Sequence, residues 1–137
     1  MYSQKVLDHF HHPRNVGEIE QPSAMIETSN PVCGDTMKLW LLLRDGIVCD
    51  AKFKVQGCVP AVACASWLTE TIKGLPVAEA GSVTVEQIEA GLGGLPAASR
   101  HAGALAIAAL RQALEALKPH DAQDQAAKIL PNNKERE

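Results

Sequence analysis

Apolar and polar residues alternate along residues 47–55 with a period of two, which is typical of a half-buried strand. One face of this strand is expected to be buried and consists of Ile47, Cys49, Ala51, Phe53 and Val55. Residues 25–28 and 37–43 are also strand-like. Asp45-Gly46 predicts a tight hairpin turn, because both residues tolerate positive φ. The pattern therefore predicts three strands joined by short connections.

Apolar residues at helical spacing flank the predicted strands. A short amphipathic helix is predicted over residues 2–11, and a second helix over residues 60–74 begins at a proline. Residues 76–80 and 84–90 predict two shorter helical pieces. The apolar series over residues 98–117 predicts a long helix that ends before a proline.

This order of elements predicts an α+β fold of two layers, in which helices pack on one face of a three-stranded antiparallel sheet. We expect one domain over residues 1–118. The polar segment over residues 119–137 is expected to be a mobile tail.

Charge and hydropathy limit the possible partners and the cellular location. The net charge of −3 and the pI near 5.9 give no electrostatic reason to expect a nucleic acid or an anionic membrane as partner. The first ten residues contain no signal-peptide stretch, and the longest apolar runs are far shorter than the roughly 20 residues that span a bilayer. We therefore expect a cytoplasmic protein whose four cysteines are core residues, metal ligands or reactive groups rather than disulfides.

Three places along the chain carry candidate chemistry. Cys33-Gly34-Asp35 places a thiol and a carboxylate where the glycine lets both face one point, although an aspartate in a turn is also a common structural choice. Cys58 lies at a predicted helix N-terminus, where the helix dipole favours a thiolate, although free cysteines are commonly small buried hydrophobes. His101 lies early in the last predicted helix, where a lone histidine is more often a surface residue than a ligand.

The remaining cysteines and histidines have structural explanations. Cys49 belongs to the predicted buried strand face, and Cys64 is expected in the core, although a role for Cys64 as a second thiol stays open. We expect four histidines on the solvated surface: His9, His11, His12 and His120.

Several segments in a fixed order carry a family resemblance, namely residues 2–10, 13–17, 30–35, 50–54, 57–58 and 66–70. At these segments the chain resembles the NifU-like (IscU-type) scaffolds of iron–sulfur cluster assembly. The resemblance covers roughly residues 2–117. It implies an exposed site that holds zinc or a nascent [2Fe–2S] cluster and is formed by Cys33, Asp35, Cys58 and His101.

Two positions depart from the family pattern. Ala102 follows His101 where the family usually has a cysteine, so the third thiol and a principal acceptor of sulfur are missing. Residues 95–99 also differ from the Leu-Pro-Pro-Val-Lys segment that chaperones recognise in the family, so chaperone-assisted release is not expected.

The resemblance implies a scaffold and not an enzyme. It would receive sulfur from a cysteine desulfurase, assemble a transient [2Fe–2S] cluster or bind iron, and pass the cluster to recipient apo-proteins. Cys58 would accept sulfur, Cys33 and His101 would bind the cluster, and Asp35 would be a weak ligand that keeps the cluster transferable. A diverged zinc- or iron-binding module is the alternative, and a thiol enzyme with Cys58 and His101 ranks behind both. The chain would be a monomer or a cluster-bridged dimer.

Overall fold

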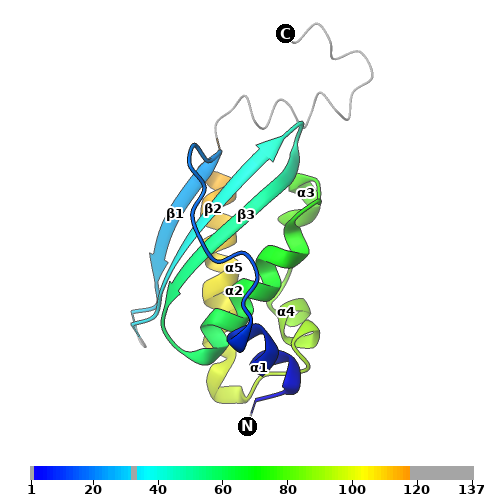
Figure 1. Cartoon of the computed structure of the whole chain (residues 1–137). Helices are drawn as coiled ribbons and strands as arrows, with labels where there is room; N and C mark the ends of the chain where they lie inside the picture. The colour runs from blue at the N-terminus through cyan, green and yellow to red at the C-terminus, as the bar shows by residue number, and fades with distance from the viewer. Residues whose placement is uncertain (1, 32–33, 118–137) are drawn as a thin grey trace, which may run out of the picture.

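The three segments with strand-like patterns pair into one antiparallel sheet in the computed structural model, which describes residues 2–31 and 34–117 (Figure 1). Strand β1 is Ala24–Ser29, β2 is Thr36–Arg44 and β3 is Ile47–Gln56, and they lie in the order β1-β2-β3. This arrangement confirms the predicted α+β fold. The predicted tail over residues 119–137 lies outside the described residues.

The helices lie against one face and one end of this sheet (Figure 1). They are α1 (Gln4–His11), α2 (Val59–Ile72), α3 (Val77–Ala80), α4 (Val85–Gly91), the short 3-10 helix η1 (Ala97–Ser99) and α5 (Arg100–Glu115). Helix α5 packs on β1 and β2, whereas α2 packs on β3 and α1. Within the described residues, no helix has the length and apolar character needed to cross a membrane.

The core lies between the sheet and these two long helices. Leu39, Leu41 and Phe53 point towards the helices and are at most 1% exposed. The apolar stripe of α5 is rich in alanine, so the helix can approach the sheet closely. Close approach also occurs between α2 and α4, where a Cβ atom at Gly91 would lie 2.2 Å from the Trp67 indole. Only a glycine fits this contact without displacing the ring.

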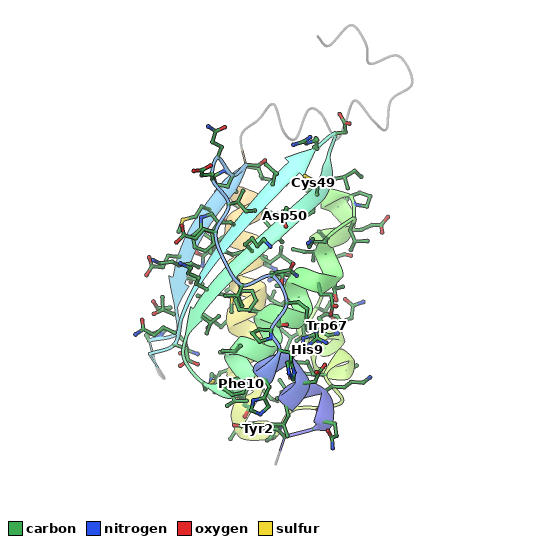
Figure 2. The ribbon with its side chains drawn as sticks, viewed as in Figure 1. Tyr2, His9, Phe10, Cys49, Asp50 and Trp67 are labelled. Carbon is green, nitrogen blue, oxygen red and sulfur yellow. The ribbon has the colours of Figure 1, made fainter. Side chains whose placement is uncertain are left out.

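The third strand departs from the predicted alternation, and the expectation for Cys49 is wrong. Leu42 pairs with Asp50 but Leu43 pairs with Val48, so Cys49 is an extra residue in a β-bulge. The bulge turns Val48 into the core and leaves Cys49 exposed at the hairpin end of the sheet (Figure 2). The predicted alternation therefore holds from Asp50 onward, whereas the buried and exposed faces are exchanged at Val48 and Cys49.

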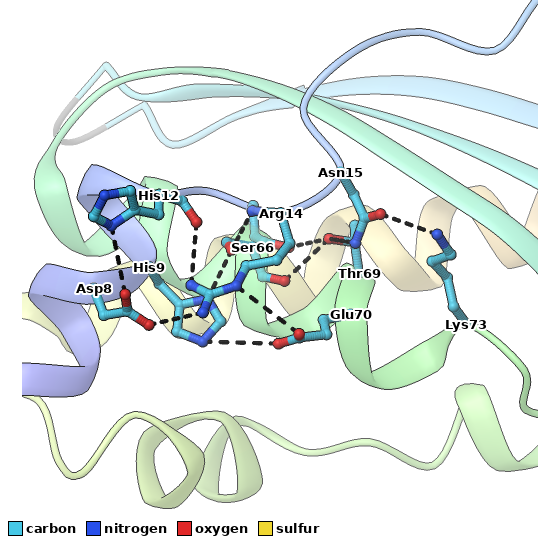
Figure 3. Close-up of polar contacts among 10 residues, drawn as sticks. Asp8, His9, His12, Arg14, Asn15, Ser66, Thr69, Glu70 and Lys73 are labelled. Atoms are coloured by element: carbon cyan, nitrogen blue, oxygen red, sulfur yellow. Dashed lines mark hydrogen bonds and ion pairs between the residues drawn. The ribbon is translucent and has the colours of Figure 1, made fainter.

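Polar contacts join α1 and the segment after it to α2, and one of them comes from a histidine that was expected at the surface (Figure 3). His9 is only 7% exposed, so that expectation is wrong, and its Nδ1 lies 2.7 Å from Ser66 Oγ. The same hydroxyl accepts a hydrogen bond from the Arg14 backbone N–H, and the Arg14 guanidinium donates to Asp8 at 2.7 Å. Burial lowers the pKa of His9, and the nearby Arg14 lowers it further.

The other predicted surface histidines divide into two groups. His11 and His12 are exposed, as expected from the sequence. His120 lies outside the part of the chain that the structure describes.

Two irregular segments occupy the outer edge of β3. Phe53 N–H donates to Asn15 O and Phe53 O accepts from Gly17 N–H, each at 3.0 Å. Asn15 has a φ of 68°, a left-handed conformation that asparagine tolerates, and its side-chain amide donates to Thr69 Oγ1. Near the hairpin end, Val48 N–H donates to the carbonyl oxygen of residue 75 and Val48 O accepts from the N–H of residue 74.

Candidate metal centre

Three of the four site residues predicted from the sequence meet at one end of the sheet. Asp35 immediately precedes β2, Cys58 is the N-cap of α2, and His101 lies in the first turn of α5. One ligand atom from each of these side chains lies within 4.8 Å of the others. Cys33, the fourth predicted residue, lies outside the described residues.

Strand register brings Asp35 and Cys58 together. The β2–β3 ladder ends with the pair Thr36 and Gln56, so the residues just beyond it, Asp35 and Gly57, leave the sheet at the same place. Cys58 follows at once, and α2 begins at Val59 with a proline in its first turn. A thiol at this position is therefore presented at the helix end beside the carboxylate.

Burial and the contact with Asp35 make the Cys58 thiol a poor acid. The Cys58 thiol donates to Asp35 Oδ2 at 3.0 Å, and Asp35 is only 7% exposed. Burial and this hydrogen bond raise the pKa of Cys58 to about 11, although a backbone amide of Ala61 acts in the opposite direction. The expectation that the helix N-terminus favours a thiolate at Cys58 is therefore wrong for the metal-free chain.

The His101 ring is held with one nitrogen directed at Cys58. Its Nδ1 lies 3.1 Å from the carbonyl oxygen of Ala98, which can only accept, so Nδ1 carries the proton. In the neutral ring Nε2 then carries the lone pair, and it lies 3.9 Å from Cys58 Sγ. A backbone carbonyl that fixes the tautomer in this way is the usual support of a metal-binding histidine. The sequence carried no signal for this support, because any residue offers a carbonyl oxygen.

The donor set suits a thiophilic cation or cluster. One sulfur, one carboxylate oxygen and one imidazole nitrogen are ligands that zinc and iron accept. Cys64 is fully buried, as predicted, with its pKa raised to about 12 by burial, and Ala102 is also fully buried. Among the described residues, Cys58 is thus the thiol that belongs to this site.

Comparisons with known proteins agree on one family. The model of the NifU-like N terminal domain matches residues 1–124. The chain is 44% identical over 114 residues to the iron–sulfur cluster assembly scaffold protein IscU 1 of Archaeoglobus fulgidus, covering 83% of this chain and 74% of the relative. It is 41% identical over 117 residues to the IscU scaffold protein of Haemophilus influenzae, covering 82% of this chain and 92% of the relative.

A solved structure shares the fold. It is the putative iron–sulfur cluster assembly scaffold protein for the SUF system from Fervidobacterium islandicum, with a TM-score of 0.68 and 23% sequence identity. The match covers 82% of this chain and 96% of that protein. The three-stranded sheet with its helices is therefore a known arrangement.

Proposed function

The chain belongs to the family of NifU-like N-terminal domains, and from this premise we propose that it is a scaffold on which iron–sulfur clusters are assembled before transfer to other proteins. The observation that carries the proposal is the convergence of Asp35, Cys58 and His101 within 4.8 Å. Relatives that cover most of this chain are scaffold proteins by name, which supports the same conclusion. The cluster is the cargo of such a protein, and the chain itself is not an enzyme.

We assign four ligands to the cargo. Asp35, Cys58 and His101 supply an oxygen, a sulfur and a nitrogen, and Cys33 supplies a second sulfur two residues before Asp35 in the sequence. Four ligands of this kind complete the coordination of a [2Fe–2S] cluster, and the same set suits a single iron or zinc ion. Cys33 enters this set from the family resemblance.

Asp35 is proposed to keep the cargo transferable. A bound cluster needs Cys58 as a thiolate, and the buried Asp35 carboxylate beside its sulfur stabilises the thiol. Removing this carboxylate should therefore strengthen the bond between Cys58 and the cluster. We expect Asp35→Ala to slow the release of a bound cluster.

The partners follow from this role. Sulfur would come from a cysteine desulfurase, with Cys58 as the acceptor, and the products would go to apo-proteins in the cytoplasm. The chain would act as a monomer or as a dimer bridged by the cluster.

One specific observation favours a second candidate function. Ala102 stands where the family resemblance expects a cysteine, and its side chain is fully buried. A chain without this thiol would fit a diverged module that binds zinc or iron and no longer assembles clusters.

Metal and sulfide analysis distinguishes the two functions. Protein purified anaerobically without added metal should contain iron and acid-labile sulfide in equal amounts if it is a scaffold. The content should fall in Cys58→Ala and His101→Ala, whereas Cys49→Ser is the matched control, because Cys49 is exposed at the other end of β3. Zinc alone, with no cluster after reconstitution, would reject the scaffold and support the metal-binding module.

A further inference from the structure

Gly57 lies at the point where Asp35 approaches Cys58. A Cβ atom built on Gly57 would lie 2.6 Å from Asp35 Cγ, 2.8 Å from Oδ1 and 2.9 Å from Cβ. Real Cβ atoms essentially never lie this close to a neighbour. The Asp35 side chain therefore occupies the space that any other residue at position 57 would need.

The backbone at Gly57 gives no separate reason for a glycine. Its φ lies outside the left-handed region, so an alanine could adopt the same conformation. Gly34 shows the opposite situation, because its φ is 79° and nothing lies within 4 Å of a Cβ placed there. Position 34 favours glycine because of its backbone conformation, whereas position 57 favours glycine because the Asp35 side chain occupies the space of a Cβ atom.

The Asp35 side chain cannot make room for a side chain at position 57 and keep its contact with Cys58. Its backbone is held by the hydrogen bond from Asn30 N–H to Asp35 O at 2.9 Å and by the adjoining pair of Thr36 with Gln56. The atoms in conflict are the Cβ and Cγ of the side chain as well as its oxygen, so a rotation of the carboxylate alone would not relieve them. A side chain at position 57 would force the whole Asp35 side chain away from the thiol.

We propose that Gly57 is a positioning residue of the site, whose missing side chain keeps Asp35 beside Cys58 and thereby determines how readily the cargo is released. The proposal rests on the scaffold function proposed above. It adds a residue that touches neither metal nor sulfur and acts through Asp35. Gly57→Ala should consequently reproduce the effect of removing Asp35.

A double-mutant cycle tests this proposal. The transfer of a reconstituted [2Fe–2S] cluster to an apo-ferredoxin is followed by circular dichroism for the wild type, Gly57→Ala, Asp35→Ala and the double variant. We expect the two single variants to slow transfer by the same factor, and the double variant to match Asp35→Ala within about twofold, the scatter of independent sites. Gln56→Ala is the control, because Gln56 is exposed and adjoins Gly57.

A second measurement uses the metal-free protein. The rate at which iodoacetamide alkylates Cys58 at a fixed pH should rise by the same factor in Gly57→Ala as in Asp35→Ala, because both variants remove the acceptor of the thiol hydrogen bond. A general loosening of the fold would not make the two variants equal. This measurement needs no cluster, so it tests the role of Gly57 even if the wild type assembles none.

The outcomes separate the two proposals. A wild type that never holds a cluster rejects the scaffold function alone, whereas alkylation and transfer in Gly57→Ala that match the wild type overturn the role of Gly57. If the double variant slowed transfer by the product of the two single factors, the role of Gly57 would be overturned as well. If Gly57→Ala does not fold, Asp35→Gly must restore folding by removing the obstructing side chain, and failure to do so refutes the proposal.

Discussion

The acidity of Cys58 provides a direct test of the site, because the charge of the neighbouring Asp35 can be removed without changing the shape of the Asp35 side chain. Asp35→Asn keeps the size of the side chain that accepts from the Cys58 thiol but removes its negative charge. The pKa of Cys58 is raised from 9.0 to about 11, with burial as the largest cause and the hydrogen bond to Asp35 as the second. Burial remains in the variant, so only part of this rise should disappear.

We expect the pKa of Cys58 to fall by about 0.5–1 unit in Asp35→Asn, which increases the thiolate fraction at pH 8 about three- to tenfold. The assay is the pH dependence of iodoacetamide alkylation in metal-free protein in which Cys33 and Cys49 are serine. Cys64 can remain, because it is fully buried and its pKa is raised to about 12.

Asp50→Asn is the matched control, since Asp50 lies at the hairpin end of β3 and should leave the profile of Cys58 unchanged (Figure 2). A midpoint for Asp35→Asn that equals or exceeds that of the wild type would refute the reasoning, because the carboxylate would then not be what stabilises the thiol.

Two further predictions concern the fold. The pKa of His9 is lowered from 6.5 in the folded chain, so the unfolded chain binds the proton more tightly. The contribution of neutral His9 to stability is therefore complete above about pH 6.5 and is lost as the pH falls through the pKa of the folded chain. Urea unfolding at pH 7.5 and 5.5 should therefore show a smaller loss of stability in His9→Gln than in the wild type, and equal losses would contradict the assignment. Gly91→Ala should lower the free energy of unfolding by about 1–3 kcal/mol, because the new methyl group would lie 2.2 Å from the Trp67 indole. Urea titrations should show a much smaller effect of Gly91→Ala in a Trp67→Leu background, and an unchanged cost there would mean that the ring is not the obstacle.

The strands and helices could be predicted from the sequence because their patterns are local. The β-bulge at Cys49 could not, since one extra residue in β3 becomes visible only when the strand is paired with β2. His9 was assigned to the surface because it lies near one end of the folded part of the chain, whereas the structure buries it beside Ser66, 57 residues further along the chain.

Some features of the candidate site could likewise be predicted from the sequence, and others could not. The residue types made Asp35 and Cys58 candidate ligands, and the family resemblance added His101 to the set. The structure brings these three side chains together. The acidity of Cys58 was predicted in the wrong direction, because the dipole of α2 was known from the sequence but the burial of the thiol and the position of the Asp35 carboxylate were not. The steric role of Gly57 likewise depends on the register between β2 and β3.

The two segments that occupy the outer edge of β3 also bear on self-association. An exposed strand edge offers free N–H and C=O groups to a strand from another molecule, and this is a common route to aggregation. Here Phe53 in the middle of β3 is paired with residues 15 and 17, and Val48 near its start is paired with residues 74 and 75. A chain that lacks only residues 13–17 would keep α1 and its core residue Val6 but lose the pairing at Phe53, and it should form β-rich aggregates. The segment after α1 thus covers part of the edge of β3 against pairing with another molecule, as well as completing the fold.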